Sequence, residues 1–164
     1  MQVSIEDKIE AFLEKKYRYS KSFHTKRSYN TSLKQFQAFL QTKYNLDINQ
    51  SIFQFEAKTL DPIVVLDEFY THLSKQPLKN SKRGYSNASI VTKITVAKEF
   101  LNNQNLHIYN EDLKQRFKMP KKEYVFEEGL TKEIISRLLR NSSSKLQTII
   151  LICVSSGMRI GELL

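Results

Sequence analysis

Residues 25–40 read TKRSYNTSLKQFQAFL, and this stretch decides the fold class. Its apolar residues recur at spacings of three and four positions, which is the period of one face of an α-helix. These residues are Tyr29, Leu33, Phe36 and Leu40. The other side carries basic and amide side chains, namely Lys26, Arg27, Asn30, Lys34, Gln37 and Gln41. The stretch therefore predicts a helix with one apolar face and one basic, amide-rich face.

Helical spacing of apolar residues continues on both sides of this stretch. Asp61-Pro62 is predicted to start one further helix, as a capping side chain followed by proline, and Asn87 is predicted to cap another. The apolar stripes of the further helices fall within residues 5–13, 63–73 and 90–101. Candidates to cap the helix of the opening stretch are Ser20, Ser22 and Thr25.

Two segments between these helices are less regular. Residues 45–60 fit either a short helix or a packed loop, and residues 77–86 read as a polar, basic loop. The predicted fold class is all-α, with a compact domain of four to five helices over residues 1–118.

A second helical pattern follows a predicted linker at residues 119–128, which contains Met119-Pro120-Lys121-Lys122. In residues 129–164, Thr131 is expected to cap a helix, and an apolar helix is expected to follow from Leu146. So short a segment cannot bury its apolar faces alone. We therefore expect it to be the first part of a larger domain.

The charge of the chain is strongly basic and uneven. Its 164 residues include 26 Lys and Arg against 17 Asp and Glu, a formal net charge of +9. Two long stretches, Lys15 to Leu46 and Phe69 to Lys98, contain no acid at all. They form one positive surface if the fold brings them together, and two solvated faces if it does not. A polyanionic partner is favoured, and nucleic acid is the commonest one.

Composition argues against several other classes. No stretch approaches 18 uninterrupted apolar residues, so no membrane partner is expected. The acidic N-terminal segment is unlike a signal peptide, which favours a cytoplasmic location. The single Cys153 excludes a disulfide framework and a Cys-rich zinc site, and no metal or cofactor is expected.

The last ten residues, Ser155-Ser-Gly-Met-Arg-Ile-Gly-Glu-Leu-Leu164, resemble the first conserved box of the tyrosine recombinases, the phage integrase and Xer-type family. That box usually reads T-G-[LM]-R-[IV]-x-E-L, and here Ser156 replaces the threonine. Residues 129–139 are similar to the opening of the family's catalytic domain.

The first part of the chain is similar to the family's core-binding domain. The pattern T-x-x-x-Y-x-x-x-L-x-x-F is matched by Thr25, Tyr29, Leu33 and Phe36. A later pattern, T-x-x-x-x-L-S-x-x-[RK]-x-F, is matched by Ser89, Ile94, Thr95, Lys98 and Phe100, with Thr92 where an arginine is common. The resemblance implies a SAM-like core-binding domain followed by the first helices of a truncated catalytic domain.

The resemblance also implies a chemistry for the arginine box. In the family, a tyrosine hydroxyl attacks a DNA phosphodiester, which gives a 3′-phosphotyrosine and a free 5′-hydroxyl without a metal or nucleotide cofactor. The matching role of Arg159 is to stabilise charge on the phosphorus, and Glu162 could orient it. The family's other catalytic groups follow this box, so the chain as it stands is not expected to cleave DNA.

The implied partner is double-stranded DNA, on which the family's protomers assemble, with the second and fourth helices near the major groove. The candidate DNA contacts are Lys21, Ser22, Thr25, Lys26, Arg27, Lys34, Lys82, Arg83, Ser89, Lys93 and Lys98. Helix capping explains the three hydroxyl residues among them nearly as well. Two alternatives stay open: a non-catalytic DNA-binding or regulatory protein, and a helical protein-interaction module.

Overall fold

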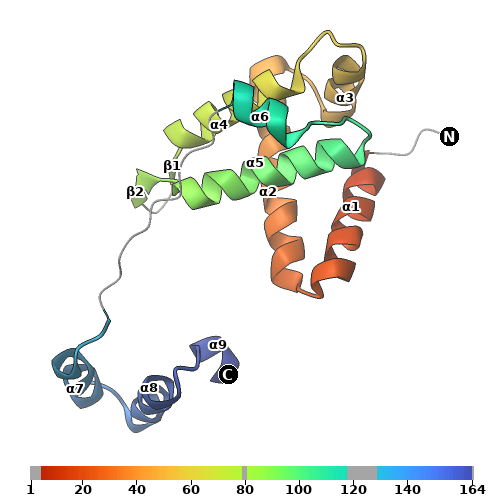
Figure 1. The fold of residues 1–164 in the computed structure, drawn as a ribbon. Helices are drawn as coiled ribbons and strands as arrows, with labels where there is room; N and C mark the ends of the chain where they lie inside the picture. The colour runs from red at the N-terminus through yellow and green to blue at the C-terminus, as the bar shows by residue number, and fades with distance from the viewer. Residues whose placement is uncertain (1–4, 79–80, 118–128, 164) are drawn as a thin grey trace. The chain divides into compact units, whose positions relative to one another are not determined.

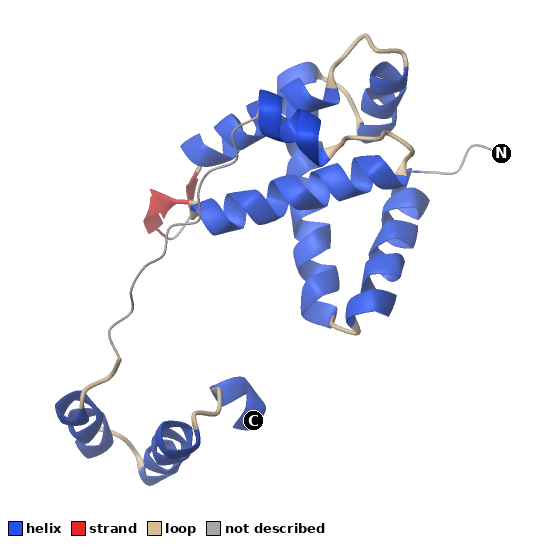
Figure 2. Ribbon diagram, viewed as in Figure 1, coloured by secondary structure: helices blue, strands red, loops and turns tan. Residues whose placement is uncertain are grey.

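The computed structural model describes residues 5–78, 81–117 and 129–163, with only the backbone described at residues 77–78 and 81–83. The predicted linker, residues 119–128, lies outside these ranges. The chain divides into two compact units, unit 1 (residues 1–123) and unit 2 (residues 124–164). The all-α fold class is confirmed, since strands occur in the described residues only as one short hairpin (Figure 2).

Unit 1 is built from six described helices and this hairpin (Figure 1). In chain order they are α1 (Ile5–Ser20), α2 (Phe23–Tyr44), α3 (Ile48–Glu56), α4 (Pro62–Lys75), β1 (Pro77–Leu78), β2 (Ser81–Gly84), α5 (Asn87–Asn103) and α6 (Asn110–Arg116). The helices α1 and α2 form an antiparallel helical hairpin, and α5 packs across α2 and against α4.

One hydrophobic core joins the helices of unit 1. The predicted stripe on α2 is buried at Leu33, Phe36 and Leu40 and partly buried at Tyr29. Phe36 packs against Phe69 of α4 with ring centroids 5.1 Å apart. These contacts hold α2 at the centre of the unit, so side chains opposite the stripe, such as Arg27 and Lys34, are left toward solvent.

Capping side chains define where several helices begin. The Ser22 and Asp61 side chains accept from backbone N–H groups at the starts of α2 and α4, as predicted. For α5 the prediction of Asn87 is wrong: Ser86 is the cap and accepts from the N–H of Ser89, 3.3 Å away. Asn87 is instead the first residue of the helix.

The two irregular segments both contain secondary structure. Residues 45–60 include the helix α3, which resolves the open choice in favour of a helix. The loop prediction for residues 77–86 is wrong in part, because β1 and β2 pair there as an antiparallel hairpin. A two-residue strand carries too little alternation to be seen in a sequence.

Unit 2 contains α7 (Lys132–Arg140), α8 (Ser144–Ser156) and α9 (Ile160–Leu163). Thr131 caps α7 as predicted, and Gly157 ends α8 with a φ of 69°. None of the residues described in this unit is buried. No helix in the described part of the chain combines the length and apolar character needed to cross a membrane.

Candidate nucleic-acid interface

The two acid-free stretches of the sequence meet at Tyr85, just before α5. The Gln35 side chain of α2 donates from Nε2 to the Tyr85 hydroxyl at 2.8 Å, across a separation of 50 residues. Lys93, on the first half of α5, places its Nζ 4.8 Å from the centre of the Tyr85 ring. The packing of α2 against α5 therefore joins the two stretches in one part of unit 1.

Lys93 is a partly buried cation among the predicted contacts of this region. Burial lowers the pKa of its ammonium group. Among the residues that the structure describes, no carboxylate forms an ion pair with it. The Lys93 ammonium group is half-buried and lies beside an aromatic ring instead of a carboxylate. It can therefore still attract an anion from outside the chain.

A row of exposed residues runs along α2 at helical spacing. It consists of Arg27, Thr31, Lys34, Ala38 and Gln41. Within the described ranges, neither Arg27 nor Lys34 takes part in an ion pair. We call this row the α2 outer face. It presents two unneutralised cations two helical turns apart.

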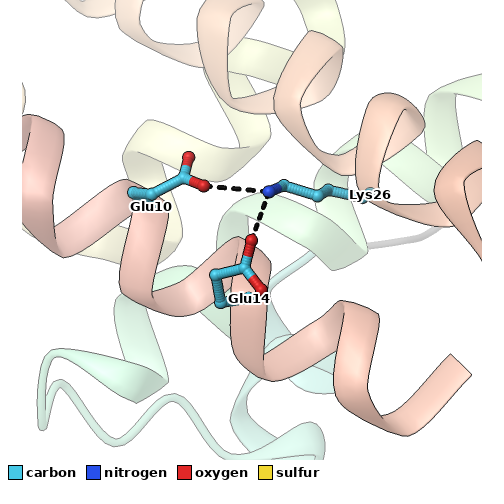
Figure 3. Close-up of polar contacts among 3 residues, drawn as sticks. All are labelled: Glu10, Glu14 and Lys26. Carbon is cyan, nitrogen blue, oxygen red and sulfur yellow. Dashed lines mark hydrogen bonds and ion pairs between the residues drawn. The ribbon is translucent and has the colours of Figure 1, made fainter. Parts of the chain in front are cut away.

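Lys26 lies on the side of α2 that faces α1, and it is held there by two carboxylates. Its Nζ is 2.9 Å from Glu10 Oε1 and also donates to Glu14 Oε1 (Figure 3). The hydrogen bonds that Lys26 donates to Glu10 and Glu14 raise the pKa of Lys26 to about 12. This predicted contact is thus engaged within the α1–α2 helical hairpin, where it links the two helices.

The remaining predicted contacts fall into four groups. At the start of α2, the Ser22 side chain accepts a hydrogen bond from the backbone N–H of Thr25. At the start of α5, the Ser89 hydroxyl lies 2.9 Å from the Ser86 hydroxyl. Lys98 donates to Asn110 of α6. Lys21 is exposed in the turn between α1 and α2. The side chains of Lys82 and Arg83, on β2, lie outside the described part of the structure.

Sequence reasoning missed Gln35 and Tyr85, which connect α2 to α5. Neither belongs to a motif, and only the packing of the two helices reveals them. It also missed the aromatic residues Tyr19 and Phe23, both strongly exposed beside the α1–α2 turn. The sequence did contain a pattern that could have found them, since aromatic and basic residues are interspersed in the segment that carries them.

Arg159 and Glu162 lie together at the start of α9 in unit 2. The Arg159 N–H donates to Glu162 Oε2 at 3.0 Å, and Arg159 Nη1 is 3.9 Å from Glu162 Oε1. The Arg159 side chain is 89% exposed. The glutamate thus caps the first turn of the helix and lies near a guanidinium that solvent can reach.

No cluster of His, Cys, Asp and Glu suited to a metal ion occurs among the described residues. Comparison of the chain with known protein families, with curated proteins and with solved structures found no match.

Proposed function

We propose that this chain is the DNA-binding portion of a site-specific tyrosine recombinase of the integrase type, and that unit 1 binds duplex DNA through α2 and α5. The observation that carries the proposal is the contact of Gln35, Tyr85 and Lys93. It joins two acid-free stretches that together supply many of the chain's cations. A cationic surface of this kind matches the regular negative charge of a phosphate backbone.

The intramolecular pairs of unit 1 reduce the predicted contact set. Lys26 and Lys98 are engaged with side chains of α1 and α6, so they are poor candidates to hold phosphates. Of the predicted basic contacts whose side chains the structure describes, four form no ion pair and no hydrogen bond to another side chain, namely Lys21, Arg27, Lys34 and Lys93. Among the described side chains, we assign the phosphate contacts of unit 1 to these four residues, and the predicted contacts Lys82 and Arg83 would bring the total to six.

The recombinase assignment rests on the arginine box of unit 2. A guanidinium presents a planar fork that matches two phosphate oxygens and stays protonated at any working pH. The exposure of Arg159 leaves this fork accessible, and Glu162 stands beside it. In a closed site, one preorganised donor contributes about 3–4 kcal/mol to stabilising a charged transition state.

The salt dependence of duplex binding tests the proposal. A dye-labelled duplex is titrated with the whole chain at several salt concentrations, and fluorescence anisotropy gives the affinity. If about six phosphates are neutralised, the log–log slope is about −5. The variants Arg27→Ala and Lys34→Ala each reduce the slope by about 1. The control Lys114→Ala removes the same charge from α6, outside both acid-free stretches, and leaves the slope unchanged. A flat salt response refutes the proposal.

A second candidate function, a helical protein-interaction module, is favoured by the exposed apolar side chains of unit 2. Leu151, Val154 and Ile160 are each more than two-fifths exposed. Analytical ultracentrifugation separates the two functions. A chain that self-associates through these residues and has no affinity for duplex DNA supports this second function and contradicts the first.

A further inference from the structure

The turn between α1 and α2 carries exposed aromatic rings. We call residues 17–27 the hairpin tip. Tyr19 is 81% exposed and Phe23 is 72% exposed, although aromatic side chains normally bury most of their surface. In Figure 1 the turn between the two helices projects beyond α5. The rings are therefore presented to solvent at an end of unit 1.

The two rings differ in how the fold uses them. Phe23 lies with its ring centroid 4.8 Å from that of Tyr17, so it helps to close the turn. Tyr19 makes no ring contact and no side-chain hydrogen bond within the described part of the chain. Packing within unit 1 gives the Phe23 ring a partial structural role, and it gives the Tyr19 ring none. An exposed ring without a structural role is available to a ligand.

Basic residues flank these rings, and two nearby carboxylates are paired with a lysine. Arg18, Lys21 and Arg27 are exposed, and none forms an ion pair in the described ranges. The carboxylates of Glu10 and Glu14, on α1, both face Lys26 (Figure 3). The hairpin tip therefore combines free positive charge with exposed aromatic faces.

We propose that the hairpin tip binds unpaired DNA bases, in a single strand or extruded from a duplex, with Tyr19 and Phe23 stacking on the bases. Proteins that hold single strands combine a cationic track for the backbone with aromatic rings for the bases, and both are present here. In a paired duplex each base face is already covered by its neighbours, so the rings discriminate in favour of unpaired bases.

This inference names a second contact beyond the duplex contact of the proposed function, and it rests on DNA being the partner. The α2 outer face begins at Arg27, which it shares with the hairpin tip, and none of its residues from there to Gln41 is aromatic. It therefore suits phosphates alone. The hairpin tip adds rings to cations, so the two surfaces are expected to respond differently to strand pairing.

A single tryptophan makes the contact visible. The chain contains no Trp, so the variant Tyr19→Trp places a unique fluorophore at the hairpin tip. Titration with a short oligothymidylate is expected to quench its emission, because stacking on a base quenches an indole. A fully paired duplex of equal length is expected to cause little change. The matched control is Phe53→Trp on α3, where the native ring is 70% exposed, and its emission should not change with either DNA.

Affinity gives the second measurement. The double variant Tyr19→Ala and Phe23→Ala is expected to weaken oligothymidylate binding about 25-fold or more, since each stacked ring contributes at least about fivefold. Its duplex affinity should stay within about twofold. Tyr19→Phe keeps a stacking ring and should restore the affinity lost with Tyr19→Ala. Circular dichroism of each variant checks that the helices are retained.

Each outcome decides the inference. An unquenched tip tryptophan overturns it, as does an equal loss of single-strand and duplex affinity in the double variant. Quenching by vesicles of anionic phospholipid without quenching by oligothymidylate assigns the hairpin tip to a membrane surface and also overturns it. Failure of the salt test with duplex DNA, together with quenching by oligothymidylate, contradicts the proposed duplex contact and leaves this inference standing.

Discussion

A single lysine links the two helices of the α1–α2 helical hairpin. Lys26 of α2 donates to Glu10 and Glu14, which stand one turn apart on α1 (Figure 3). An exposed ion pair alone contributes little to stability, but one cation shared by two carboxylates is a small network. Its position favours a role in fixing α1 against α2.

The variants Lys26→Met and Arg27→Met separate structural from DNA-binding cations. Lys26→Met leaves two carboxylates without their cation, so we expect a lower melting temperature and an unchanged salt slope for duplex binding. Arg27→Met removes a free cation of the α2 outer face, so we expect an unchanged melting temperature and a slope reduced by about 1. Thermal scans and anisotropy titrations measure both, and a slope lowered equally by the two variants contradicts the assignment.

The cluster of Lys26, Glu10 and Glu14 makes part of the stability of the fold depend on pH. The hydrogen bond from Lys26 lowers the pKa of Glu14 from its ordinary value of 4.5. A carboxyl whose pKa is lower in the folded chain stabilises the fold at pH values above its pKa in the unfolded chain. This stabilisation is lost as the pH falls through the pKa that the carboxyl has in the folded chain. We therefore expect Glu14→Gln to lower the melting temperature near neutral pH and to have no effect well below pH 4.5.

Melting temperatures across this pH range measure the effect of Glu14→Gln. The control is Glu56→Gln, at the end of α3, which has no ion pair in the described part of the chain. A difference between Glu14→Gln and the native chain that persists in acid would show that the glutamate acts through something other than its charge.

The environments of Lys26 and Arg27 mark the limit of sequence prediction at this scale. The two residues are adjacent, and both match a basic helix face. A rotation of 100° along the helix turns one toward α1 and the other toward solvent. The pattern of α2 shows which residues face the core, but the position of α1 decides which cations are paired.

At the scale of elements, α3 shows how a short helix is specified by its start. Asp47 accepts from the Gln50 N–H at 2.8 Å, and Gln50 Oε1 accepts from the Asp47 N–H at 2.9 Å. This reciprocal pair is a capping box, and the sequence Asp47-x-x-Gln50 contains its signature. The helix could therefore have been predicted from its capping signature. The spacing of apolar residues could not decide, because over so short a segment it fits a loop as well as a helix.

Loss of this cap has a predictable cost. Asp47→Ala removes the acceptor for the Gln50 N–H, so we expect the free energy of unfolding to fall by about 1 kcal/mol. Urea denaturation followed by circular dichroism measures it. Asp67→Ala is the control, because Asp67 is an exposed carboxylate within α4, and we expect it to change stability by less than about 0.5 kcal/mol. If the two substitutions lowered the free energy of unfolding equally, the result would contradict a capping role for Asp47.

At the scale of the whole chain, the fold class was predictable because each amphipathic stripe is a local pattern. The stripes of α2, α4 and α5 all proved to be buried in one core. The contact of Gln35 with Tyr85 was not predictable, since it depends on how α2 and α5 cross. The candidate interface was thus foreseen as two basic stretches, and its connection through Tyr85 required the structure.

The two units differ in how much apolar surface they cover. Unit 1 buries aromatic side chains such as Phe12 and Phe100, whose ring centroids are 5.4 Å apart, within one core. In unit 2, the residues described between 129 and 163 include no buried side chain. Helices as short as α7 and α8 are only marginally stable without tertiary packing.

Hydrogen exchange should reveal this contrast directly. Opening that exposes little apolar surface requires little free energy, so amides of α7 and α8 should exchange quickly in the free chain. Amides of α2 and α5 should exchange only through global unfolding, because both helices are anchored in the core of unit 1. Mass spectrometry of peptic fragments measures the two rates in one sample. Strong protection of α8 would mean that its apolar side chains are covered in solution, and gel filtration of the same sample would then show whether a second copy covers them.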